Sequence, residues 1–166
     1  MVHFVGAGPG APDLITVRGK QYLEEADVVI YAGSLVNPKL LEYTKDICTI
    51  YNSAKMTLEE VIHVIEKAEA EGKTTVRLHT GDPCIYGAIR EQMDILDEKN
   101  ITYDYCPGVS AFCGAASALN LEYTLPNGQK VKFLDDQKTY LGNQLESEFG
   151  EDSCFGILAS MDFILV

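Results

Sequence analysis

Three loops rich in glycine and proline stand where apolar runs of the sequence end. They are Gly6–Gly10 (Gly-Ala-Gly-Pro-Gly), Thr80–Pro83 (Thr-Gly-Asp-Pro) and Pro107–Ser110 (Pro-Gly-Val-Ser). Glycine leaves the main chain uncovered, so a small molecule can approach its amides and carbonyls closely. The repeated pattern predicts a ligand-binding cleft that is lined largely by main chain.

The elements that must position these loops alternate along the chain. Apolar runs predict strands at Val2–Val5, Asp27–Tyr31, Ile47–Tyr51, Thr74–Leu78 and Ile101–Cys106. Helical spacing predicts helices at Leu14–Ala26, Thr57–Gly72, Ala88–Lys99 and Ser110–Leu119. This alternation indicates an α/β fold with a mostly parallel five-stranded sheet and helices on both faces. Ligands bind such sheets beyond the carboxyl ends of the strands, which is where the three loops fall.

Two helix starts rest on particular residues. Thr57-Leu-Glu-Glu60 has the form of a capping box, in which threonine and glutamate satisfy backbone amides reciprocally. In the first helix, apolar residues recur at helical spacing, with Lys20, Glu24 and Glu25 on the other side; the apolar residues are Leu14, Ile15, Val17, Tyr22, Leu23 and Ala26. We therefore expect these apolar side chains to pack against the sheet.

The first loop invites comparison with dinucleotide-binding proteins. Their fingerprint is GxGxxG, whereas Gly6–Gly10 reads GxGxG, and Pro9 removes an amide that a pyrophosphate would use. Tyr31-Ala-Gly33 stands where an acidic residue would bind the ribose. A nucleotide-dependent oxidoreductase is therefore disfavoured, and a purely structural tight turn stays open.

Asp82 has two interpretations. It can cap the next helix, with Pro83 at the first helical position. Alternatively, the backbone at Thr80 and Gly81 holds a nucleoside-like ligand and Asp82 adds a polar contact. The two roles are compatible.

Other chemistries lack their residue patterns. His3, His63 and His79 have no metal-ligand spacing, and the five cysteines form neither a CxxC pair nor a Cys/His cluster, so we predict no metal site. The cysteines are expected to be reduced thiols, most of them in the core. No GxSxG is present, which argues against a hydrolytic triad. No catalytic residue is assigned.

Charge and hydropathy restrict the partners and the location. A net charge of −12 and a pI near 4.5 argue against nucleic acid and against anionic membranes, because both bind clustered lysine and arginine. The sequence has neither a run of apolar residues long enough to span a membrane nor the pattern of a signal peptide. We expect a cytoplasmic protein.

Four segments together resemble the tetrapyrrole (corrin/porphyrin) methylases. These segments are Val5–Gly19, Ala26–Val36, Leu78–Gly87 and Pro107–Ala111, within a resemblance that extends from residue 1 to Pro126. The variants Tyr31–Val36 and Tyr51–Ala54 are most similar to the members that methylate C-11 of precorrin-4 or cobalt-precorrin-4 in the cobalamin pathway. The resemblance implies a homodimeric methyltransferase that moves a methyl group from S-adenosylmethionine to a ring carbon of a precorrin-type tetrapyrrole.

The resemblance also implies where the cofactor is held. Mapped onto matching positions, the cofactor-binding residues would be Pro9, Thr80, Gly81, Asp82, Ile85, Ser110 and Ala111. Related uroporphyrinogen methylases carry an aspartate at the position of Ala32, so an acid–base role shared with them at this position is excluded. The tetrapyrrole substrates carry many carboxylates, and the cations nearest the motifs are Arg18, Lys55 and Arg90.

The resemblance implies a second α/β domain that this sequence does not display. We interpret residues 1–126 as the N-terminal domain and residues 127–166 as an unassigned tail. The interpretation is that the methylase is truncated or frame-shifted, or that its tail has been replaced. We therefore expect one wall of the cofactor cleft, with weakened or absent catalysis by this chain alone. The alternative hypothesis is a non-catalytic binding or assembly domain that retains the methylase fold.

Overall fold

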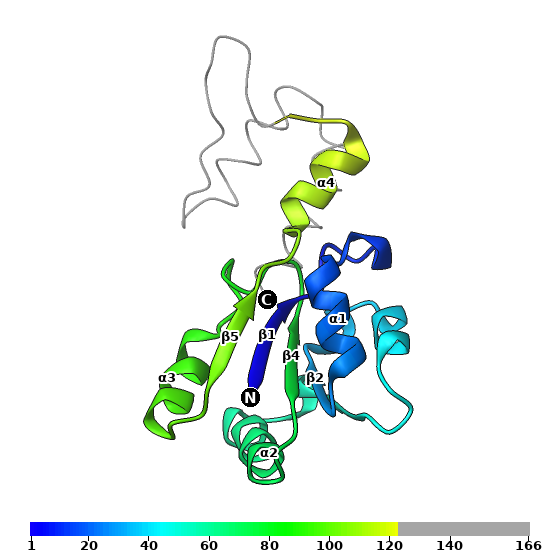
Figure 1. Cartoon of the computed structure of the whole chain (residues 1–166). Coiled ribbons are helices and arrows are strands. Elements are labelled where there is room, and N and C mark those ends of the chain that lie inside the picture. Colours follow the sequence, from blue (N-terminus) through cyan, green and yellow to red (C-terminus); the bar gives the residue numbers. More distant parts are fainter. Residues whose placement is uncertain (123–166) are drawn as a thin grey trace. The chain divides into compact units, whose positions relative to one another are not determined.

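The computed structural model describes residues 1–122, and within them five parallel strands form one sheet (Figure 1). The strand order is β3-β2-β4-β1-β5. The strands are β1 (Val2–Gly6), β2 (Val28–Tyr31), β3 (Thr49–Asn52), β4 (Thr75–His79) and β5 (Tyr103–Cys106). The α-helices are α1 (Val17–Glu25), α2 (Leu58–Ala70), α3 (Arg90–Glu98) and α4 (Ala111–Leu119). Short 3₁₀ helices are η1 (Pro12–Leu14), η2 (Gly33–Leu35), η3 (Pro38–Tyr43) and η4 (Ser53–Lys55).

The chain divides into two compact units, Met1–Ser110 and Ala111–Val166. The sheet belongs to the first unit, and the second contributes α4 to the described residues. The predicted boundary at residue 126 and the tail 127–166 lie outside the described residues. None of the described helices is long and apolar enough to cross a membrane.

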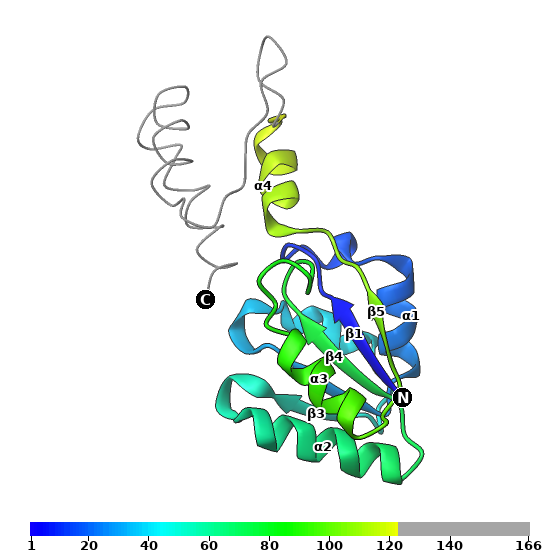
Figure 2. The ribbon, with the colours of Figure 1, turned by 90° about the vertical axis from the view of Figure 1, so that its left-hand side faces the viewer.

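Helices cover both faces of the sheet, as Figure 2 shows. Alternate residues of a strand point to opposite faces, so Phe4 joins a core with α2 and α3, whereas Val5 joins a core with α1 and η3. Both faces of β2 are buried as well. A strand that is buried on both faces reads as a continuous apolar run, which is why β1 and β2 were visible in the sequence. The predicted fold class is confirmed.

The start and end of α2 follow the sequence prediction. Thr57 Oγ1 accepts a hydrogen bond from the Glu60 amide at 3.3 Å, and Glu60 Oε2 accepts one from the Thr57 amide at 2.8 Å. Gly72 adopts φ +67° after the helix, a conformation that glycine reaches without a steric penalty. The capping box and the glycine stop are confirmed.

The predicted apolar face of the first helix was partly wrong. Thr16 caps α1 by accepting a hydrogen bond from the Gly19 amide at 3.1 Å, so the helix begins only at Val17. This start leaves Val17 77% exposed and places Leu14 in η1, where it is 38% exposed. Leu23 is fully buried as predicted.

The four cysteines that the structure describes are free, but they are less buried than expected. Cys106 is buried in the core and Cys48 is half-buried, whereas Cys84 and Cys113 are exposed. The expectation of core thiols was therefore wrong for Cys84, which follows the β4 loop, and for Cys113, which lies on α4. Cys154 lies outside the described residues.

Candidate ligand-binding site

The three loops meet because β4, β1 and β5 are neighbours in the sheet. The Gly8 amide donates to the Gly81 carbonyl at 3.2 Å, and the Gly81 amide donates to the Gly8 carbonyl at 2.9 Å. The Ala7 amide also donates to the carbonyl of His79 at 2.7 Å. The loop after β1 is thereby paired, main chain to main chain, with the loop after β4.

Glycine is required where the loops touch. A Cβ atom on Gly108 would lie 2.1 Å from the carbonyl oxygen of Gly81, and one on Gly6 would lie 2.5 Å from Gly108 Cα. Gly8 and Gly81 have φ values of +78° and +59°, which favour glycine independently of the space. The glycines that stood out in the sequence therefore let three strand ends pack backbone against backbone.

Asp82 connects the second loop to the third. Its Oδ2 accepts from the Gly108 amide at 3.1 Å, while its Oδ1 accepts from the Cys84 amide at 2.9 Å and from the hydroxyl of Tyr105. Asp82 as a whole is 8% exposed. Both carboxylate oxygens are thus engaged by donors of the protein.

The prediction that Asp82 caps a helix was wrong. The Ile85 amide donates to the Asp82 carbonyl at 3.0 Å, which closes one turn, but α3 begins only at Arg90. Tyr86 and Ala88, which follow this turn, have φ values of 58° and 48°, outside the helical region. Asp82 therefore caps a turn.

The structure brings six of the seven predicted cofactor residues to this edge. Pro9 and Ile85 are half-buried, and Gly81, Asp82 and Ser110 are buried. Ala111 begins the second unit, so the site of the first unit comprises the other six.

Thr80 carries an unusual hydroxyl. Its Oγ1 atom is buried and has no hydrogen-bond partner among the described residues. A buried polar atom without a partner is costly in a folded protein. This hydroxyl is therefore available to a polar group of a ligand.

Two residues that support the site were missed in the sequence. The Asn37 side-chain amide donates to the Gly10 carbonyl at 2.7 Å and fixes the end of the first loop. Asn37 followed by Pro38 is a recognisable helix start, and Asn37 does cap η3, but the pair gives no hint of the contact with Gly10. Tyr105 lies on a predicted strand, and no local signal indicated its bond to Asp82.

The candidate cations all follow the carboxyl ends of strands. Arg18 lies in the first turn of α1, Lys55 ends η4 and Arg90 begins α3. The Arg90 guanidinium pairs with Asp94, whose carboxylate raises the pKa of that guanidinium. Within residues 1–122, Arg18 and Lys55 form no ion pair. Of the three candidate cations, Arg18 and Lys55 are therefore the two more available to an anionic ligand.

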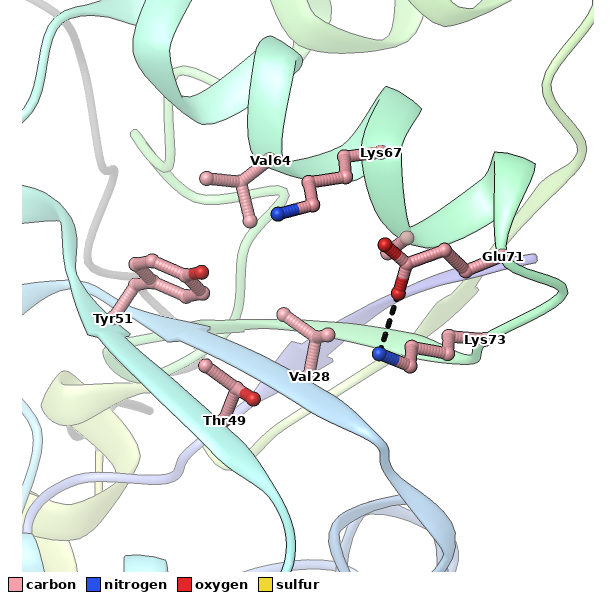
Figure 3. Close-up of a pocket in the computed structure, with 8 residues that line it drawn as sticks. Val28, Thr49, Tyr51, Val64, Lys67, Glu71 and Lys73 are labelled. Atoms are coloured by element: carbon pink, nitrogen blue, oxygen red, sulfur yellow. Dashed lines mark hydrogen bonds and ion pairs between the residues drawn. The ribbon is translucent and has the colours of Figure 1, made fainter.

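A separate hollow of about 100 Å³ lies between α2 and the amino ends of β2 and β3 (Figure 3). Val28 and Thr49, the first residues of these strands, line it together with Lys67. Glu71 and Lys73 close one side through the ion pair drawn in Figure 3. None of the predicted cofactor residues borders this hollow.

Comparison with known proteins identifies the family. The profile of the Tetrapyrrole (Corrin/Porphyrin) Methylases matches residues 1–152. This chain belongs to the tetrapyrrole methylases. The family match extends past residue 126, where the motif resemblance ended.

Relatives of this tetrapyrrole methylase include curated methyltransferases and solved structures. A cobalt-precorrin-4 C(11)-methyltransferase of Methanocaldococcus jannaschii is 60% identical over 125 residues, covering 75% of this chain and 48% of the relative. A solved cobalt precorrin-4 methyltransferase is 37% identical with a TM-score of 0.77, covering 89% of this chain and 65% of that one. The uroporphyrin-III C-methyltransferase of Thermus thermophilus, solved in complex with S-adenosylhomocysteine, is 30% identical with a TM-score of 0.62, covering 76% of this chain and 50% of that one.

The chain spans about half the length of the curated relatives it matches. The family match over residues 1–152 contains all three loops. Within the described residues, no three of the side chains of histidine, cysteine, aspartate and glutamate gather in a way that could hold a metal ion.

Proposed function

We propose that this chain provides one wall of the S-adenosylmethionine site of a methyltransferase that acts on C-11 of precorrin-4 or cobalt-precorrin-4 in cobalamin biosynthesis. The observation that carries the proposal is the set of interlocked loops after β4, β1 and β5. The 60% identity to a cobalt-precorrin-4 C(11)-methyltransferase supports the choice of substrate.

The residues at this edge fit the cofactor. S-adenosylmethionine presents hydroxyl, amino and carboxylate groups, and the buried Thr80 hydroxyl needs a polar partner of that kind. Gly81 and Ser110 add main-chain groups, Pro9 and Ile85 add apolar surface, and Asp82 holds the loops in register. Ala111, which belongs to the second unit, stays a prediction from the family resemblance.

The chemistry asks the chain mainly to position the reactants. The bound cofactor supplies an electrophilic methyl group on a sulfonium, which an electron-rich ring carbon attacks in line, leaving S-adenosylhomocysteine. Ala32 offers no carboxylate, and both oxygens of Asp82 are occupied by the protein's own donors. The residues of this wall therefore contribute orientation, which is worth several kcal/mol in well-aligned reactions.

Assembly and location are part of the same proposal. The family resemblance supports a cytoplasmic homodimer, and the acidic charge supports a small-molecule substrate over nucleic acid or membrane. Matches to methyltransferases over 75% of the chain favour this function over the non-catalytic assembly domain. Sedimentation velocity of the purified chain measures the oligomeric state.

The cofactor proposal is tested by isothermal titration of the 166-residue chain with S-adenosylhomocysteine. We expect saturable binding by the wild type and its loss in Gly108→Ala, because the added Cβ would lie 2.1 Å from the Gly81 carbonyl oxygen. Overpacking of this kind costs about 1–3 kcal/mol of stability. Thermal unfolding of the variant shows whether it is still folded at the temperature of the titration.

Gly72→Ala is the matched control. Gly72 has φ +67°, so alanine is strained there too, but a Cβ would meet open space and the residue follows α2, away from the loops. We expect a similar or smaller loss of stability with unchanged affinity. No heat from the folded wild type at millimolar ligand would defeat the proposal.

A further inference from the structure

Arg77 is buried in the middle of the sheet, and residues 1–122 supply no carboxylate partner for it. It lies on β4 and is 7% exposed. Its Nε donates to Gln92 Oε1 at 3.0 Å and an Nη donates to the carbonyl of Ile30 at 3.1 Å. Burial lowers the pKa of the guanidinium to about 10, so the group stays charged at neutral pH. Burying an unpaired charge is expensive, which calls for a role other than stability.

Gln92 connects Arg77 to the segment before α3 through a second hydrogen bond. It is 6% exposed on α3, and its Nε2 donates to the carbonyl of Ala88 at 3.3 Å. A guanidinium only donates and a carbonyl only accepts, so the two neighbours together fix the orientation of the amide. Arg77, Gln92 and Ala88 form a continuous chain from β4 to the segment before α3.

That segment, residues 83–89, holds an unfavourable backbone. Tyr86 and Ala88 have positive φ values of 58° and 48°, which are costly for residues with a Cβ. A Cβ on Gly87 would lie 2.1 Å from the carbonyl oxygen of Pro83, so the segment folds back tightly on its own start. Such a conformation persists only when surrounding contacts hold it.

We propose that Arg77 and Gln92 are positioning residues for the cofactor site. By holding the Ala88 carbonyl they keep segment 83–89 folded back, and this fixes Ile85 within the segment and Thr80 and Asp82 just before it. The effect on affinity rests on the proposed S-adenosylmethionine site, whereas the effect on the segment itself does not.

Gln92→Glu separates the two hydrogen bonds of Gln92. The carboxylate still accepts from Arg77 and supplies a counter-charge to it, but it cannot donate to the Ala88 carbonyl. We expect an unchanged or higher melting temperature. We also expect the Kd for S-adenosylhomocysteine to rise about 3- to 10-fold, which corresponds to the free energy of one lost hydrogen bond. We also expect faster amide hydrogen exchange in residues 84–89, with unchanged protection of β4.

Tyr103→Phe is the control. It removes the 3.1 Å bond from the Tyr103 hydroxyl to Asp97, which lies at the other end of α3, and should change neither the Kd nor the exchange of residues 84–89. If the wild type fails to bind the ligand, the proposed function fails, and the exchange measurement still tests the positioning role. Wild-type exchange of residues 84–89 in Gln92→Glu would overturn that role. So would a lowered melting temperature with exchange accelerated evenly over the first unit, because that result indicates general stability alone.

Discussion

His79, the last residue of β4, is a buried imidazole beside a buried cation. Its Nε2 atom has no hydrogen-bond partner within the described part of the chain, and its ring centroid lies 6.2 Å from that of Phe4. Burial, and then the charge of Arg77, lowers its pKa well below 6.5. The native protein therefore keeps His79 neutral at a pH where the unfolded chain protonates it.

This difference predicts a stability that falls with acidity. The unfolded state binds the extra proton below about pH 6.5, so the contribution of His79 is fully present above that pH and is lost as the pH falls toward the folded pKa. The slope is at most about 1.4 kcal/mol per pH unit. Thermal unfolding between pH 7.5 and 5.5 measures it, and we expect a shallower slope in His79→Gln. The exposed His63 gives the control His63→Gln, which should keep the wild-type slope; equal slopes in all three proteins would contradict the assignment.

Helix α1 is fastened to the sheet by a polar cluster of three side chains. Asp104 on β5 accepts from the Tyr22 hydroxyl at 2.8 Å and lies 2.6 Å from Nδ1 of His3. The rings of Tyr22 and His3 are stacked, with centroids 3.9 Å apart. The hydrogen bond to Asp104, burial and the charge of Asp104 together raise the pKa of Tyr22, so its hydroxyl stays a donor at neutral pH.

Tyr22→Phe should therefore lower the free energy of unfolding by about 1 kcal/mol, because it removes a bond to a carboxylate that is partly exposed and leaves the ring stack in place. A double-mutant cycle with Asp104→Asn in urea measures the coupling between the two side chains. Additive losses from the two single variants would show that the bond contributes nothing to the docking of α1.

The elements were predictable to the extent that their signals are local. Strands buried on both faces appear as apolar runs, and the loops were found because glycine and proline mark the strand ends. The start of α1 was misplaced because Thr16 competes for the cap against a continuing apolar pattern. The bonds of Asp82 to Gly108 and of Arg77 to Gln92 join residues that the fold alone brings together, and no spacing in the sequence indicates them.

At the scale of the whole molecule, the negative net charge opposes binding of the proposed substrate. A chain of net charge −12 repels a polycarboxylate unless local cations offset the field. Of the three cations at the carboxyl edge, Arg90 is paired with Asp94, whereas Arg18 and Lys55 form no ion pair with any residue of the described part. The three should therefore differ in what they contribute to substrate affinity.

Fluorescence titration with uroporphyrin, a polycarboxylate tetrapyrrole, measures that difference. Arg18→Gln and Lys55→Gln should each weaken binding about 2- to 5-fold at low salt, as expected for exposed charges worth about 0.5–1 kcal/mol. Arg90→Gln should have a smaller effect, because Asp94 already offsets the charge that it removes. Raising the ionic strength screens these interactions and should shrink the differences. If Arg90→Gln weakened binding more than the other two, the anionic substrate would have to lie against α3, and the roles assigned to Arg18 and Lys55 would be wrong.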